Sequence, residues 1–348
     1  MPASAAALHE QRPLTRGQAR ELYRAMRRLR TIDERMMTLQ RQGRIGFYGA
    51  ATGQEAAVIG SAYALEPTDW IFPALREGGA MLLRDYPLVA YLAQLFGNRA
   101  DVLKGRQMPS HQADRRVRQV SWGSCIGSQL PQAVGAAFAA RRLHRPDVML
   151  AYLGDGATST SDFHSALTFA GVWQAPVVFF CQNNHWSISL PTSQQTAART
   201  LAAKALGYGM PGLKIDGNDV LQVVATTREA VARARAGAGP TLVEAETYRI
   251  GAHSSSDDPT RYRDEREVEV WRGRDPIRRL REVLERDQGF SDAEERALGA
   301  ELLAEVNAAL AEAEAQQPPE PKTLFDDVYA QRPWHLQEQR ERFLAGEA

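Results

Sequence analysis

The sequence predicts an α/β protein with a doubly wound, mainly parallel sheet and helical extensions at both ends. Apolar runs near 148–153, 177–181, 213–215 and 241–246 alternate with helical patterns near 162–170, 196–206 and 219–236. Such alternation is typical of parallel strands joined by crossover helices. Outside this region, apolar residues recur at three- and four-residue steps from Thr15 to about Gln42 and again over 292–317. These two periods predict the helical extensions.

The N-terminal part divides into an arm, a helix and a loop. Residues 1–14 are predicted to form a flexible arm, and the helix over 15–42 has a basic outer face. Gly43 to Gly53 is rich in glycine and aromatic residues, including Phe47, which favours a functional loop. A small-residue helix over 54–65 and a short strand over 69–73 follow.

The rest of the chain adds two long loops and a tail. Residues 98–120 lack periodicity, and the small-residue loop 121–128 enters a helix, which leaves backbone N–H groups and space for a ligand. We expect one α/β domain over 15–290 and a helical C-terminal segment with a partner-packing tail over 291–348. That tail is expected to pack on the same domain or on a partner.

Composition excludes several classes of protein. Of the 348 residues, 42 are Lys or Arg and 42 are Asp or Glu, so no basic surface for nucleic acid or membrane is predicted. The two cysteines form no disulfide framework, and no run approaches the length of a membrane span. The first residues lack a secretory signal, so a bacterial cytoplasmic location is expected. The mitochondrial matrix is the alternative if a presequence has been removed.

The chemistry is concentrated between Leu150 and Ser189. One apolar run ends at Gly154-Asp155-Gly156, a helix capped by Ser161 or Asp162 follows, and the next run ends at Asn183-Asn184. Ligands of parallel sheets bind at the carboxyl ends of the strands, and carboxylate and amide oxygens suit Mg²⁺. A dinucleotide fingerprint fits poorly, because serine occupies position 159 and no acid follows the next strand.

The better match is a thiamine diphosphate motif, which runs from Gly-Asp-Gly to Asn-Asn over about thirty residues. Gly154 to Asn184 spans 31 residues. Asp155, Asn184 and the carbonyl of Trp186 are the expected metal ligands, with diphosphate oxygens and water completing an octahedron.

Two further residues become candidates for a functional role if such a site is present. Arg76 lies by glycines after a strand and suits an anion, although an exposed arginine at a turn is the alternative. His253 lies in a polar loop of 19 residues from Thr247, where a histidine suited to proton transfer near neutral pH is credible. For His111, the sequence favours neither a functional nor an incidental role.

Motifs along most of the chain then identify a family. They include RTIDERMMTLQRQGRIGFY, DWIFPALREGG, LPQAVGAA, GDGATSTSDFH, QNNHWSIS, TYRIGAHSSSDDPTRYR and LFDDVY. The chain resembles alpha subunits of thiamine-dependent 2-oxo acid dehydrogenases, and the segments QRQGRIGFY, KGRQMP and LFDDVY resemble the branched-chain branch more than the pyruvate branch. The resemblance covers about residues 20 to 335.

The resemblance implies the thiamine diphosphate-binding fold and an α2β2 heterotetramer that decarboxylates a branched-chain 2-oxo acid and acylates the lipoyl group of an acyltransferase core. It implies thiamine diphosphate and Mg²⁺ as cofactors. Its implied contacts are Arg76, Ser124, Ile126, Gly154, Asp155, Gly156, Ala157, Asn184, Trp186 and the catalytic His253, with Phe47 in the substrate pocket and Ser254, Arg249, Asp257, Tyr262 and Arg263 as regulatory or loop-bracing residues.

Some positions depart from the family. Leu75 stands where relatives carry tyrosine, and Gln182 replaces an arginine of some relatives. The loop 121–128 differs from the usual Ser-Ser-Pro-Leu pattern, which leaves a K⁺ site there open. No strand-borne glutamate that would activate the aminopyrimidine is evident, so we expect the partner chain to supply it. Pyruvate or acetoin as substrate, and a non-catalytic regulatory subunit, are the alternatives.

Overall fold

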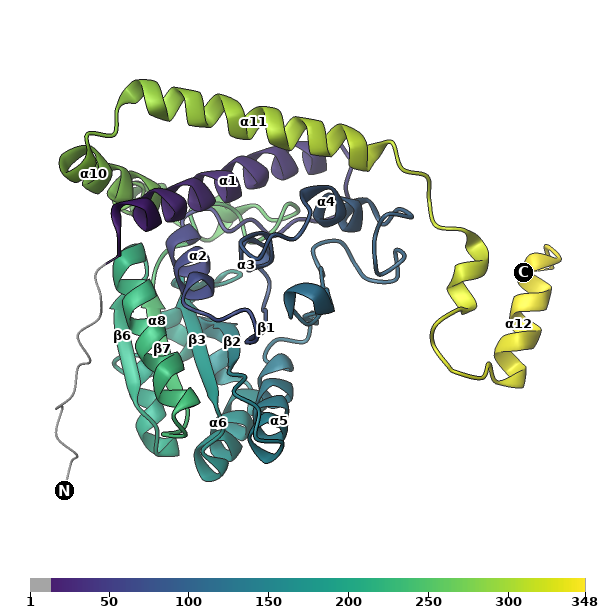
Figure 1. Cartoon of the computed structure of the whole chain (residues 1–348), viewed down its shortest axis with the longest axis horizontal. Coiled ribbons are helices and arrows are strands. Elements are labelled where there is room, and N and C mark those ends of the chain that lie inside the picture. The colour runs from purple at the N-terminus through teal and green to yellow at the C-terminus, as the bar shows by residue number, and fades with distance from the viewer. Residues whose placement is uncertain (1–13, 348) are drawn as a thin grey trace.

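The computed structural model describes residues 14–347, and its core is a five-stranded parallel sheet (Figure 1). The strands run in the order β1-β2-β3-β7-β6, with bounds Trp70–Phe72, Met149–Gly154, Val177–Asn183, Thr241–Glu246 and Gly212–Asp216. All neighbouring pairs are parallel, and Gly154 is in register with Gln182. The carboxyl ends of β2 and β3 therefore lie side by side, as the sequence predicts. A small antiparallel pair, β4 (Trp186–Ser187) and β5 (Leu190–Pro191), follows β3.

Helices cover both faces of the sheet, which confirms the doubly wound prediction. Alternate residues of β3 supply the two cores: Val178 and Phe180 face one side, while Phe179 and Cys181 face the other. The first core includes α1 (Arg16–Arg41), α2 (Glu55–Tyr63), α8 (Val220–Arg235) and α10 (Pro276–Gln288). The second includes α5 (Gln129–Arg142), α6 (Ser161–Trp173) and the 3₁₀ helix η3 (Ala202–Tyr208).

A third core forms where α11 (Asp292–Glu314) lies over α1 and α4 (Leu88–Phe96). The basic face of α1, expected to face outward, is covered by acidic residues of α11. Arg20, Arg24 and Arg28 pair with Glu294, Glu301 and Glu305 at 2.9, 2.7 and 2.6 Å. The predicted domain boundary at residue 290 stays a prediction. The packing on α1 and α4 joins α11 to the helices that surround the sheet.

Two helix boundaries differ from the predicted ones. The cap of α6 is Thr160, whose hydroxyl accepts from the Phe163 N–H, so the prediction of Ser161 or Asp162 is wrong. The predicted helix over 196–206 is also wrong, because only α7 (Thr192–Gln195) and η3 are helical. The Glu244 carboxylate accepts from the Ala202 N–H and caps η3 from β7, which delays its start.

Several further short helical elements were not predicted, among them α3 (Gly78–Leu82), α9 (Glu265–Arg272), η5 (Pro321–Phe325) and α12 (Trp334–Leu344). The last two lie away from the body at the end of an extended segment (Figure 1). Trp334 is 77% exposed there, and Arg106 anchors the segment through the Thr323 carbonyl. The predicted flexible arm, residues 1–14, lies outside the described residues except for Leu14. No described helix is long and apolar enough to cross a membrane.

Candidate active site

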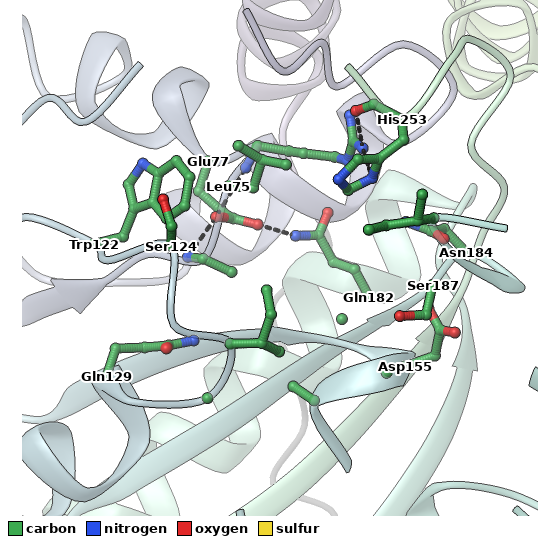
Figure 2. Close-up of a pocket in the computed structure, with 18 of the residues that line it drawn as sticks. Leu75, Glu77, Trp122, Ser124, Gln129, Asp155, Gln182, Asn184, Ser187 and His253 are labelled. Atoms are coloured by element: carbon green, nitrogen blue, oxygen red, sulfur yellow. Dashed lines mark hydrogen bonds between the residues drawn. The ribbon is translucent and has the colours of Figure 1, made fainter. Parts of the chain in front are cut away.

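A cavity of about 360 Å³ opens at the carboxyl ends of β1, β2 and β3. Figure 2 shows Asp155, Asn184 and Ser187 at one end of it and Trp122, Ser124 and Gln129 at the other. Every residue predicted to bind cofactor, metal or substrate lines this cavity, namely Phe47, Arg76, Ser124, Ile126, Gly154, Asp155, Gly156, Ala157, Asn184, Trp186 and His253. The sequence motif and the geometry thus agree on one location.

Asp155 begins the 3₁₀ helix η2 (Asp155–Ser159) directly after β2. Its carboxylate is buried, with 2% of the residue exposed, and its Oδ2 accepts from Gln195 Nε2 at 2.8 Å and Thr192 Oγ1 at 3.1 Å. Burial raises the pKa of Asp155 above its usual range, although the hydrogen bonds from Gln195 and Thr192 oppose this rise. The geometry therefore favours a bound cation next to this group.

The other two predicted metal ligands follow β3. The Trp186 N–H donates to Asn184 Oδ1 at 3.2 Å, and the Asn184 amide nitrogen donates to Gln54 Oε1 at 3.1 Å. The Trp186 carbonyl accepts a long 3.5 Å contact from Arg249 Nη1. Among residues 14–347, no cluster of three or more His, Cys, Asp or Glu side chains could hold a metal. A site here must therefore use amide and carbonyl oxygens beside its one carboxylate.

The turn around Asp155 brings the backbone close to the cavity. A Cβ at Gly156 would collide with the Ser187 side chain, so glycine permits β4 to approach η2. A Cβ at Gly154 would meet nothing within 4 Å, because Gly154 lines the cavity. This open, glycine-lined wall leaves space for a ligand beside the carboxylate.

Arg76 and His253 form a second polar group on the cavity wall. The Arg76 guanidinium donates to the carbonyls of Ala50 and His253, the latter at 2.7 Å. Nδ1 of His253 faces Arg76 Nη2 at 3.4 Å and Arg249 Nη1 at 3.5 Å. Burial and these two cations lower the pKa of His253 to about 4. His253 is therefore neutral at pH 7 when no anion is bound beside it.

The loop-bracing residues surround His253 without lining the cavity. Asp257 accepts from the His253 backbone N–H at 2.7 Å and from the Tyr262 hydroxyl at 2.5 Å. Tyr262 in turn accepts from Arg249 at 2.8 Å, and Arg263 donates to the Arg249 carbonyl. This network fixes the backbone of the polar loop.

Ser254 lies inside the same loop and is buried, with 8% of the residue exposed. Its hydroxyl is 3.4 Å from that of Ser256. A protein that modified this hydroxyl would have to act on an opened loop.

Sequence reasoning missed several buried polar residues of the cavity. Glu77 accepts from the backbone N–H groups of Ala74 and Arg76 at 2.7 and 3.2 Å and from the Gln182 amide (Figure 2). Gln54, at the start of α2, was read only as part of a helix. His111 stacks on Trp122 with ring centroids 3.8 Å apart and faces Ser124 at 3.4 Å. The glycine-rich REGG and GQE segments were the available signals.

Apolar side chains surround the mouth of the cavity. Ile126 is 60% exposed, and Met108 and Ile188 are also exposed. Exposed apolar residues beside a ligand cavity are typical of an interface with another chain or with a substrate.

Comparisons with known proteins decide the family. Residues 23–322 match the family model described as "Dehydrogenase E1 component". The chain belongs to this family. It is 43% identical over 322 residues to human 2-oxoisovalerate dehydrogenase subunit alpha, mitochondrial, covering 92% of this chain and 72% of the human one. It is 45% identical over 328 residues to the 3-methyl-2-oxobutanoate dehydrogenase subunit alpha of Mycobacterium tuberculosis (strain ATCC 25618 / H37Rv), covering 94% and 86%.

The E1 membership confirms the resemblance found in the sequence. A plant relative, the Arabidopsis thaliana 2-oxoisovalerate dehydrogenase subunit alpha 2, mitochondrial, is 41% identical over 320 residues, covering 92% of this chain and 68% of its own length. Membership implies thiamine diphosphate as the cofactor and a beta chain as partner.

The cavity fits that cofactor. Gln182 Oε1 and Gln54 Nε2 are buried, line the cavity and lack a hydrogen-bond partner among the described residues. The cavity wall carries the buried Asp155 carboxylate and the buried Arg76 guanidinium, and Arg249 contacts His253 without lining the cavity. Such groups are suited to a metal-bound diphosphate.

Proposed function

We propose that this chain is the alpha subunit of a branched-chain 2-oxo acid dehydrogenase E1 component, assembled with a beta chain as α2β2. The observation that carries the proposal is the convergence of Asp155, Asn184, Arg76 and His253 on one cavity. Its relatives in three organisms bear names for dehydrogenases of 2-oxoisovalerate or 3-methyl-2-oxobutanoate.

In this proposal the residues of the cavity hold the cofactor by its diphosphate end. Asp155, Asn184 and the Trp186 carbonyl hold Mg²⁺, and Arg76 balances the diphosphate charge together with backbone groups of Gly156 and Ala157. Ser124 and Ile126 contact the ring at the other end. Thiamine diphosphate supplies the carbon nucleophile and the electron sink for decarboxylation.

His253 is the group of this chain that handles protons in the proposed reaction. With Nδ1 facing two guanidinium groups, a neutral imidazole accepts there and carries its proton on Nε2. The Nε2–H can donate a hydrogen bond to a substrate oxygen, and Phe47 contributes to the acyl pocket. Transfer of the acyl group to a lipoyl group of an acyltransferase core completes the proposed function.

The described residues do not supply a free carboxylate for the aminopyrimidine. Glu77 is the glutamate on the cavity wall, and it already accepts from two backbone N–H groups and from Gln182. We therefore expect the isolated chain to show no decarboxylation above background with 3-methyl-2-oxobutanoate, thiamine diphosphate and Mg²⁺. Addition of the beta chain should restore turnover, and measurable turnover by the chain alone would contradict this arrangement.

The substrate class is tested by competition between 2-oxo acids. We expect the reconstituted enzyme to prefer 3-methyl-2-oxobutanoate over pyruvate by about tenfold or more in kcat/KM, because each extra methyl group in a fitting apolar pocket contributes to binding. Decarboxylation is followed by release of labelled carbon dioxide. A preference for pyruvate would retain the thiamine chemistry and overturn the branched-chain assignment.

Three finer points are part of the proposal. A phosphate on Ser254 would place about two negative charges beside His253 and disturb the Asp257–Tyr262 bracing. Whether a K⁺ ion binds at the 121–128 loop is left undecided, because the sequence of that loop departs from the family pattern. We propose the bacterial cytoplasm as the location; relatives named mitochondrial and a bacterial relative are both similar to the chain.

A further inference from the structure

Gln54 is held at the cavity wall by a constrained turn. Gly53 before it has a φ of +92°, a conformation that favours glycine. The Gly53 carbonyl accepts from Thr247 Oγ1 at 3.0 Å, and the Gln54 N–H donates to the Ala51 carbonyl at 2.7 Å. Gln54 is 0% exposed, so its side chain has a fixed place between α2 and the end of β3.

The two ends of the Gln54 amide have different surroundings. Its Oε1 accepts from Asn184 Nδ2 at 3.1 Å. The orientation of the Asn184 amide is set independently, because the Trp186 N–H donates to Asn184 Oδ1 at 3.2 Å. Gln54 Nε2 is buried without a partner among the described residues. A buried donor of this kind indicates a missing acceptor.

We propose that Gln54 is a positioning residue for the metal ligand Asn184 and that its free amide N–H donates to an oxygen of the bound diphosphate. By accepting from Asn184 Nδ2, Gln54 holds the remaining lone pair of Asn184 Oδ1 toward the cation. The inference rests on the proposed thiamine diphosphate and Mg²⁺ site. It adds a residue that contacts both the metal ligand Asn184 and the diphosphate.

Two substitutions separate the two roles of Gln54. Gln54→Met keeps the length of the side chain and removes both the acceptor and the donor. Gln54→Glu keeps an acceptor for Asn184 and removes the donor while adding a negative charge. Gln119→Met is the control, since Gln119 is a buried glutamine with an unpaired Oε1 outside the cavity.

The readout is the dissociation constants of Mg²⁺ and thiamine diphosphate, measured by calorimetry on the assembled alpha–beta enzyme. Loss of a group that orients a metal ligand raises the Mg²⁺ constant by about 10- to 100-fold. We expect this rise in the Mg²⁺ dissociation constant for Gln54→Met and not for Gln54→Glu or Gln119→Met. For Gln54→Glu we expect a Mg²⁺ dissociation constant within about threefold of wild type. The dissociation constant of thiamine diphosphate should rise by about tenfold, because one charge-assisted hydrogen bond to the diphosphate is lost.

Each result decides a separate claim. An unchanged Mg²⁺ constant in Gln54→Met, or a large rise in Gln54→Glu, overturns the positioning role. An unchanged thiamine diphosphate constant in Gln54→Glu overturns the donor role, also when Gln54→Met fails to fold. Wild-type enzyme that binds neither ligand refutes the proposed function itself, whereas tight wild-type binding with indifferent variants refutes only this inference.

Discussion

Replacement of Asp155 by asparagine is expected to weaken Mg²⁺ binding by more than about 100-fold and to abolish decarboxylation at ordinary Mg²⁺ concentrations. A direct metal ligand contributes more than the outer-shell groups whose loss costs about 10- to 100-fold. Asparagine keeps the shape of the side chain and an oxygen for Gln195 and Thr192, but it removes the only carboxylate of the predicted ligand set. Titration of the reconstituted enzyme with Mg²⁺ measures the effect.

The same substitution should stabilise the chain when metal and cofactor are absent. Because burial raises the pKa of Asp155 in the folded state, the ionised carboxylate destabilises the fold above its unfolded pKa, and this penalty grows as pH rises. Asparagine carries no such penalty, so the melting temperature of metal-free Asp155→Asn should exceed that of wild type at pH 7. Asp162→Asn, at the start of α6, is the control. Equal Mg²⁺ affinity in Asp155→Asn and wild type would refute the metal role.

Replacement of His253 by alanine should lower kcat by about 10²- to 10⁴-fold, the range typical of a positioned acid or base. The affinity for thiamine diphosphate and Mg²⁺ should change far less, since Arg76, Asp155 and Asn184 remain. Decarboxylation and cofactor binding are measured on the same reconstituted samples. His164→Ala is the control, because His164 bonds to Tyr208 on the far side of α6 and does not line the cavity. Unchanged turnover in His253→Ala would leave the cavity without a proton donor from this chain.

The protonation of His253 gives a second measurement of the same role. Burial and two guanidinium groups hold the pKa of His253 near 4, and binding of a diphosphate anion beside the guanidinium groups should raise that pKa. The imidazole signal of histidine-labelled chain, titrated with and without pyrophosphate, reports this shift, and His253→Ala assigns the signal. Without an anion, the neutral imidazole contributes stability above pH 6.5 that is lost as pH falls toward 4. A pKa that pyrophosphate leaves unchanged would show that the anion binds elsewhere.

The sequence was sufficient for those features in which local pattern and chemistry coincide. The apolar runs predicted the sheet, because β2, β3 and β7 are buried along nearly their whole length and consist mainly of apolar residues. The Gly-Asp-Gly and Asn-Asn termini predicted the metal end, since parallel strands bring their carboxyl ends together. The start of η3 was missed because the side chain that caps it, Glu244, belongs to the distant strand β7.

The remaining site residues depend on contacts between distant segments. Gln54 and Asn184 are 130 residues apart, and Glu77 and Gln182 are 105 apart. Their roles follow from which amide faces which, and no spacing rule encodes that. The lowered pKa of His253 likewise depends in part on Arg76, which lies 177 residues away in the sequence.

The packing of α11 on α1 has a consequence for how the protein is made. Arg24 and Arg28 meet Glu301 and Glu305 across a separation of 277 residues, and apolar residues of both helices share the third core. Helix α1 therefore meets α11 only after the chain has been synthesised as far as Glu314. Contacts so distant in sequence form late, because closing a long loop costs entropy before any contact rewards it. Until then, the apolar residues of α1 and α4 in the third core lack their α11 neighbours, and a truncated chain that ends before α11 leaves them partly uncovered.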